Sequence, residues 1–124
     1  MSHEQPPLVV ITTNEERVLP DAFVRRCLVL HLELPKERTE LIARLMERGA
    51  GHFPRCDETI LRLAAEKVAD DRKDSKRLTC PPGQAEFLDL VRAVTTLADT
   101  PKAQDELLKE VAVYFLQKHP DEER

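Results

Sequence analysis

The hydrophobic positions of this chain repeat differently before and after about residue 35. Leu8–Ile11 is a continuous, largely β-branched run, which is typical of a strand buried on both faces. In Leu28–Leu34 the leucines alternate with other residues, and this period of two predicts a second strand. Pro20–Arg26 lies between them and fits one short helix with proline near its first turn. The first part therefore predicts a strand, a polar tip, a short helix and a strand.

The second part has apolar residues at helical spacing and predicts four amphipathic helices. Gly49 and Gly51 are expected to stop the first helix, and Asp57 to cap the second. The charged residues 70–77 are expected to form a solvated connection. Thr100 should cap the fourth helix, which should end at His119-Pro120. The expected helices are Lys36–Arg48, Glu58–Asp70, Gln84–Ala98 and the segment from Pro101.

These patterns predict a mostly α fold with a small β part, divided into residues 1–35 and 36–124. The 124 residues suffice for one domain, or for a small domain with a piece of another. A net charge of −4 without a basic cluster argues against general nucleic-acid binding. The apolar runs are too short to span a bilayer, and no signal-peptide core begins the chain. Three widely spaced cysteines are typical of a reducing compartment, so we expect a cytoplasmic protein.

Two stretches carry a family resemblance: Ile11–Asn14, and Leu19–Cys27 with the sequence Leu-Pro-Asp-Ala-Phe-Val-Arg-Arg-Cys. Together they resemble the segment of MoxR-like AAA+ ATPases that runs from the sensor-1 strand through the arginine finger to the last core strand. The Arg-Arg-Cys tripeptide is also similar to the Ser-Arg-Cys motif of clamp loaders. The resemblance covers about the first third of the chain, and the four expected helices fit the helical lid that follows the core in this family.

The resemblance implies roles for three residues. Asn14 follows a buried-type strand, where ligands of parallel α/β sheets gather, and would hold an attacking water or touch a γ-phosphate. Arg26 matches the arginine finger, which would reach the nucleotide of a neighbouring subunit with a permanently charged, planar guanidinium. Arg25 is the alternative, since adjacent residues on a helix point about 100° apart. From the residues alone, Asn14 also fits a turn, and either arginine fits a surface ion pair with Glu15 or Glu16.

The sensor-2 arginine of many relatives has no clear counterpart here. The matching region, Thr79–Phe87, has no arginine at its helix start, and Glu86 stands near the expected position. Arg77 is the candidate substitute from the preceding loop. An ordinary helix entry is the favoured interpretation of this region.

Two nucleotide-binding motifs of the family are missing from this sequence. There is no GxxxxGK[ST] phosphate loop and no apolar run that ends in Asp-Glu. We therefore expect ATP and Mg²⁺ only in an intact AAA+ context, and no activity from this chain alone. The resemblance covers only the second half of such a module, which fits a piece of a longer protein, an isolated domain or a natural small protein.

The implied partners are other AAA+ subunits or a missing N-terminal half, together with a von Willebrand A-type protein. Self-association is also expected, because an unpaired apolar strand such as Leu8–Ile11 recruits another chain. A non-enzymatic helical protein-interaction module is the alternative function, and a clamp-loader-like role is a distant third. His52 and Cys56 have a spacing that can chelate zinc on a helix, but Pro54 separates them, so we expect no metal site. Cys27 and His31 are expected to be a core and a surface residue.

Overall fold

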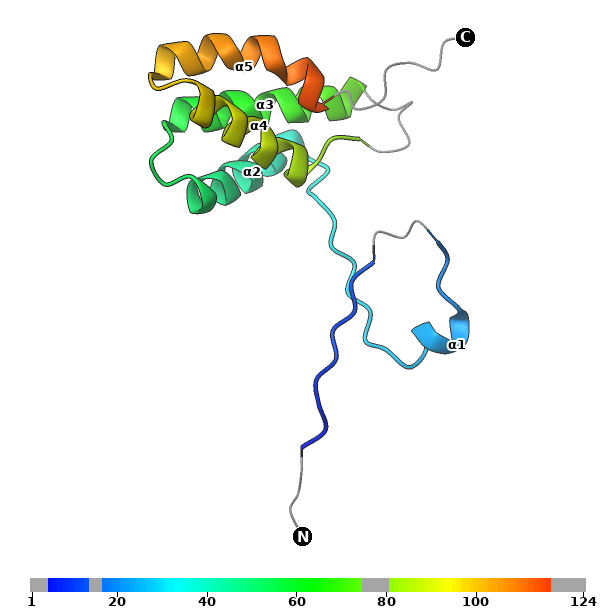
Figure 1. The fold of residues 1–124 in the computed structure, drawn as a ribbon. Helices are drawn as coiled ribbons and strands as arrows, with labels where there is room; N and C mark the ends of the chain where they lie inside the picture. Colours follow the sequence, from blue (N-terminus) through cyan, green and yellow to red (C-terminus); the bar gives the residue numbers. More distant parts are fainter. Residues whose placement is uncertain (1–4, 14–16, 75–80, 117–124) are drawn as a thin grey trace. The chain divides into compact units, whose positions relative to one another are not determined.

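The computed structural model describes residues 5–13, 17–74 and 81–116 of the chain. The chain divides into two compact units, residues 1–32 and residues 33–124, which are described separately (Figure 1). Among the residues that the structure describes, the first unit contains one short helix and the second contains four long ones. The helices are α1 (Asp21–Val24), α2 (Arg38–His52), α3 (Glu58–Asp74), α4 (Gln84–Leu97) and α5 (Pro101–Leu116).

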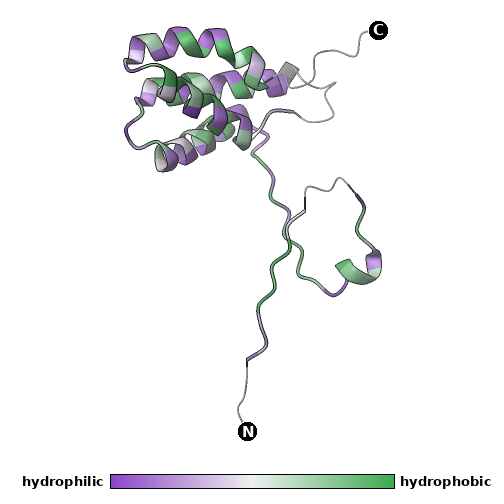
Figure 2. Ribbon diagram, viewed as in Figure 1, coloured by the Kyte–Doolittle hydropathy of each residue, from purple (hydrophilic) through white to green (hydrophobic). Residues whose placement is uncertain are grey.

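In the second unit, the four long helices form a bundle in which α3 and α4 each contact all the other helices. The outer helices α2 and α5 each contact both α3 and α4 (Figure 1). Hydrophobic and hydrophilic residues alternate along these helices, as an amphipathic helix requires (Figure 2). The prediction of a mostly helical chain is confirmed. The largest side chains that are fully buried in the core are Phe87, Leu45, Ile60, Leu90, Leu108, Val68, Val91 and Val94.

The predicted apolar faces are mostly correct, and one exception lies at the end of α4. Leu97 was expected on the buried face, but its side chain is 71% exposed. Gln104 of α5 is buried beside this end of α4 instead. Its Nε2 donates a hydrogen bond of 2.8 Å to the carbonyl oxygen of Ala98. The amide thus pairs with a carbonyl that the helix end leaves without an intrahelical partner. The predicted Thr100 cap is present, since its Oγ1 accepts from the Ala103 N–H at 3.3 Å.

The predicted stop at Gly49 and Gly51 is wrong, because α2 continues through both residues to His52. Gly49 is buried, and a β-carbon added there would lie 2.7 Å from Leu61 Cδ2 and 2.9 Å from Phe87 Cζ. Gly49 is therefore the point where α2 closely approaches its neighbours. Nothing lies within 4 Å of a β-carbon added to Gly51. Phe53 is the C-cap residue that follows the helix, and its N–H donates to the Gly49 carbonyl at 2.8 Å.

The predicted solvated connection at residues 70–77 is also wrong over its described part, because α3 continues to Asp74. The charged sequence contains no helix breaker, and its basic residues Arg72 and Lys73 lie in the last turn. Cations there interact favourably with the negative end of the helix dipole. Asp70 also holds an ion pair with Arg38 of α2, so this turn of α3 has a tertiary contact. A high local charge thus coexists with a regular helix.

In the first unit, the strand–helix–strand expectation is met only by the helix. Neither Leu8–Ile11 nor residues 28–34 form a strand in the described part of the chain. Their side chains are exposed: 90% for Leu8, 80% for Leu30 and 87% for Leu32. Strands need hydrogen-bonded neighbours, and a pair of strands alone is marginally stable. Leu34, in contrast, belongs to the second unit and packs against the bundle core.

Residues 33–124 are expected to fold without the first unit, because their core is built from α2 to α5. A fragment beginning at Glu33 should give a helical circular dichroism spectrum and one cooperative thermal transition. Its midpoint should lie within a few degrees of that of the full chain. A broad, non-cooperative melt of the fragment would contradict this expectation.

Candidate functional site

The two candidate finger residues lie in a tight turn at the end of α1. Pro20 precedes the helix, and its carbonyl accepts from the N–H groups of Phe23 at 2.9 Å and Val24 at 3.1 Å. Arg25 is the C-cap residue, and the Arg26 N–H donates to the Phe23 carbonyl at 3.1 Å. This last bond spans three residues, so the turn tightens as the helix ends. Short-range backbone bonds therefore fix the point from which both arginines project.

Both arginines are exposed, and neither forms an ion pair with another described residue. Cys27 is exposed as well, with its thiol donating to the Phe23 carbonyl at 3.4 Å, so the expectation of a core cysteine is wrong. His31 is exposed as expected. The turn thus presents two guanidinium groups to the outside, which is what a contact with an anion requires.

Asn14 and Arg77, the other two candidate site residues, lie outside the described residues. The acidic residues Glu15 and Glu16, weighed as ion-pair partners of the arginines, lie outside them too. The sensor roles that the family resemblance implies for Asn14 and Arg77 therefore stay predictions.

The described part of the region expected to hold sensor 2, residues 81–87, forms the entry into α4. The Glu86 carboxylate accepts from the Gly83 N–H at 2.9 Å, so it binds back to the residue that precedes the helix. Arg72 of α3 donates to the carbonyl of Pro82, which is buried, at 2.7 Å. Glu86 thus caps the entry into α4. The hydrogen bond from Arg72 to the Pro82 carbonyl links the entry into α4 to α3.

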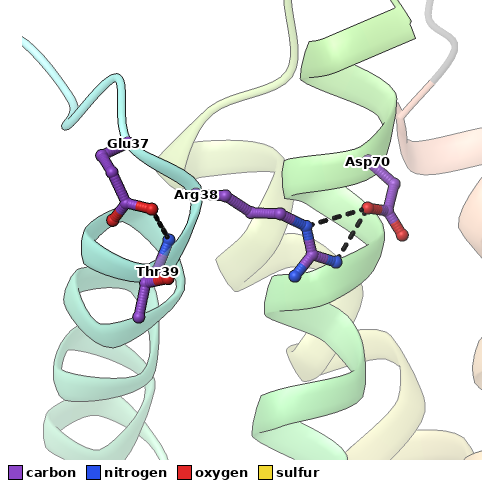
Figure 3. Close-up of polar contacts among 4 residues, drawn as sticks. All are labelled: Glu37, Arg38, Thr39 and Asp70. Atoms are coloured by element: carbon purple, nitrogen blue, oxygen red, sulfur yellow. Dashed lines mark hydrogen bonds and ion pairs between the residues drawn. The ribbon is translucent and has the colours of Figure 1, made fainter.

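The entry into α2 is held by an acidic cap that the sequence pattern did not predict. The Glu37 carboxylate accepts from the backbone N–H of Thr39 at 3.0 Å (Figure 3). It also accepts from the backbone N–H of Glu40 at 2.8 Å. These two bonds lower the pKa of Glu37. Arg38 reaches from α2 to α3 and donates through Nη2 to Asp70 at 2.8 Å, which raises the pKa of Arg38 (Figure 3). Glutamate is not among the common capping residues, so the residue type alone does not indicate this cap.

The Glu37 cap should make the bundle less stable in acid. Because its pKa is lowered in the folded chain, its stabilisation is fully present above the ordinary glutamate pKa of about 4.3 and is lost as the pH falls through the folded value. The melting temperature of Glu37→Gln should lie below that of the parent at pH 7, and the difference should shrink between pH 4.3 and pH 3. Exposed Glu106 on α5 provides the matched control, Glu106→Gln, for which we expect no such convergence. An unchanged difference at pH 3 would show that the carboxylate charge is not the cause.

The turn between α2 and α3 borders a pocket of about 350 Å³. Asp57 caps α3 as predicted, because its Oδ1 accepts from the Thr59 N–H at 2.8 Å. Hydrogen bonds from the Thr59 side chain and from the Thr59 backbone lower the pKa of Asp57. The adjoining thiol of Cys56 lines the pocket, and burial, with the nearby Asp57 charge, raises its pKa. Phe53, also in the lining, lies under the guanidinium of Arg92, 5.9 Å from the ring centre.

His52 and Cys56, whose spacing could chelate zinc on a helix, do not lie on the same helix. His52 is the last residue of α2, and Cys56 lies in the turn before α3. Among the described residues, no group of three His, Cys, Asp or Glu side chains is placed to hold a metal ion. Within the described ranges, the fold therefore does not place further metal-ligating side chains beside His52 and Cys56.

The two features of this site that the sequence analysis missed are the Glu37 cap and the pocket. The first could have been found from a carboxylate placed two and three residues before free helical N–H groups. The second depends on how α2 and α3 meet, and a one-dimensional pattern contains no such information.

Comparison with protein-family models, curated proteins and solved structures finds no match to this chain. Within the described part of the chain, the helices are too short or too polar to cross a membrane.

Proposed function

We propose that this chain supplies the sensor-1, arginine-finger and lid parts of a MoxR-like AAA+ assembly that uses ATP to remodel partner proteins. The observation that carries the proposal is the exposed turn with Arg25 and Arg26. It stands between two exposed apolar segments and precedes a helical bundle with its own core. A strand–helix–strand segment followed by a lid is the arrangement of the second half of an AAA+ module.

In this proposal the missing strands of the core complete the first unit. Leu8–Ile11 and residues 28–32 present exposed apolar side chains that a neighbouring sheet would cover, and their backbone would join that sheet. Asn14 would then serve the nucleotide of its own module, and Arg26 the nucleotide of the neighbour. A von Willebrand A-type protein is the proposed partner of the assembly. Self-association of the chain is the other way in which these segments would be covered.

The isolated chain is expected not to bind ATP, because its sequence lacks the phosphate loop and the Mg²⁺-binding carboxylates. Titration calorimetry with ATP and Mg²⁺ should give no binding heat. Tight, Mg²⁺-dependent binding by the chain alone would contradict the proposed division of the site.

The positive test adds the phosphate-loop half of a MoxR-like ATPase as a separate polypeptide. The mixture should hydrolyse ATP, whereas each half alone should not. Size-exclusion chromatography of the mixture should show both polypeptides in one complex. If they fail to associate, or associate without hydrolysis, the proposed role of the first unit is wrong.

A non-enzymatic helical interaction module is the second candidate function. The observation that favours it is the pocket at the α2–α3 turn, because this pocket lies wholly within the second unit and needs no nucleotide. A chain that binds a protein partner through this unit, with or without the first unit, would support this candidate.

A further inference from the structure

Leu34 lies where the exposed apolar residues of the chain give way to residues packed on the bundle. Two positions earlier, Leu32 belongs to the first unit and is 87% exposed. Leu34 belongs to the second unit, is half-buried and packs against the core of the bundle. Because the residue type is the same, the difference in burial comes from the surface that the Leu34 side chain meets.

This surface is the entry into α4. A β-carbon added to Gly83 would lie 3.5 Å from Leu34 Cδ1, so Leu34 lies beside the residue that precedes the helix. The Gly83 N–H donates to the Glu86 carboxylate at 2.9 Å, and the Gly83 carbonyl accepts from the Phe87 N–H at 3.1 Å. Leu34 is therefore placed next to the hydrogen bonds with which α4 begins.

The entry into α4 depends on contacts from outside the helix. Gly83 has no side chain with which to cap it, and the carbonyl of the preceding residue, Pro82, accepts from Arg72 of α3 at 2.7 Å. Arg72 thus holds the entry through a hydrogen bond, and Leu34 holds it through an apolar contact. Removal of the Leu34 contact would loosen the entry while the bond from Arg72 remains.

The sequence gives Leu34 a second place to pack. The leucines of residues 28–34 occupy every second position, so a strand over this range would place all of them, Leu34 included, on one face. Pro35 has no N–H to donate to a sheet, so such a strand would end at Leu34. The residue before a proline also favours extended backbone, which suits a strand. A layer that covers the whole leucine face would therefore draw Leu34 away from Gly83.

We propose that Leu34 is a conformational switch that links strand formation in residues 28–34 to the order of the α4 entry. In the chain alone, its side chain packs on the bundle and holds the entry. When residues 28–34 join a sheet, Leu34 packs with the other leucines of the strand and the entry loosens. This inference rests on the proposed function, because the missing half of the AAA+ module supplies the sheet.

Amide hydrogen exchange of the full chain measures how strongly Leu34 holds the entry. Leu34→Ala should speed exchange of the Gly83 and Phe87 N–H groups by about 5- to 30-fold, as expected when a half-buried leucine is truncated. This increase should exceed any change at Leu108 of α5, whose amide reports opening of the whole bundle. Leu32→Ala is the matched control and should leave both rates unchanged, because Leu32 is exposed.

Addition of the phosphate-loop half of a MoxR-like ATPase tests the switch itself. In the complex, exchange of the Gly83 and Phe87 N–H groups should rise by about the same factor as in free Leu34→Ala. Complexed Leu34→Ala should show no further rise, because the contact that the switch releases is already absent. Size-exclusion chromatography of the same mixtures shows whether the complex has formed.

The outcomes separate the switch from the proposed function. A complex in which exchange at Gly83 and Phe87 is unchanged or slower would overturn the switch and leave the proposed function standing. Absence of a complex would remove the proposed function, and the switch with it. In the chain alone, equal exchange in Leu34→Ala and Leu32→Ala would overturn the role of Leu34 at the entry. Leu34→Met keeps the side-chain volume and should retain the rates of the parent.

Discussion

Arg26→Ala is expected to lower the ATP hydrolysis rate of the completed two-part assembly by on the order of 10³- to 10⁵-fold, as loss of an arginine finger does in other nucleotide hydrolases. The reason is that the guanidinium would stabilise charge on the transferred phosphoryl group, while nucleotide binding itself depends on other residues. The ATP-binding affinity of the assembly should therefore change little. Steady-state kinetics and nucleotide titration on the same preparation measure the two effects separately.

Arg25→Ala is the matched control, because it removes the same group from the preceding residue of the same exposed turn. Its rate should stay close to that of the parent. If Arg25→Ala abolishes hydrolysis and Arg26→Ala does not, the finger has been assigned to the wrong residue. Equal losses from both would indicate that the turn contributes charge without a specific finger.

Mixed assemblies distinguish a finger from a residue that serves its own subunit. Arg26→Ala subunits mixed with subunits that cannot bind ATP should regain part of their activity, because the intact arginine of one subunit would reach the nucleotide of its neighbour. Asn14→Ala subunits should show no such recovery, because the proposed role of Asn14 is within its own subunit. Recovery in both mixtures would contradict the separate roles.

The elements of the second unit could be predicted from sequence because each helix carries its own apolar face. Ile60, Leu61, Ala64 and Val68 recur at helical spacing, and all four are buried in the structure. A pattern of this kind depends on the helix alone, since any neighbour can cover the apolar face. The caps of Asp57 and Thr100 were predictable for a similar reason, because they act within a few residues of sequence.

The first unit shows why strands were harder to predict. Leu8–Ile11 has the composition of a buried strand, yet a strand exists only with a hydrogen-bonded neighbour, which lies elsewhere in a sequence or in another chain. The prediction that Gly49 ends α2 was wrong for a different reason. The residue type is typical of a helix end, but here the absence of a side chain serves the packing of α2 against Leu61 and Phe87. Both cases depend on tertiary contacts that local patterns do not contain.

Gly49→Ala is expected to destabilise the bundle by about 1–3 kcal/mol, the usual cost of adding a methyl group to a filled core. The added β-carbon would lie 2.7 Å from Leu61 Cδ2 and 2.9 Å from Phe87 Cζ. Leu61 is 4% exposed and Phe87 is 0% exposed, so both side chains are packed in the core. This cost outweighs the gain of about 0.5–1 kcal/mol that alanine provides over glycine within a helix.

Gly51→Ala is the matched control on the same helix, because nothing lies within 4 Å of its added β-carbon. There the helical preference acts alone, and the variant should be more stable than the parent by up to about 0.5–1 kcal/mol. Urea unfolding of the full chain measures both changes, and Leu61→Ala makes the mechanism testable. In the Leu61→Ala background, the loss caused by Gly49→Ala should become smaller, because one of the two clashing groups is gone and neighbouring sites are not additive. Stabilisation by Gly49→Ala, or an equal loss in both backgrounds, would show that the close approach of α2 to α3 does not determine the glycine at this position.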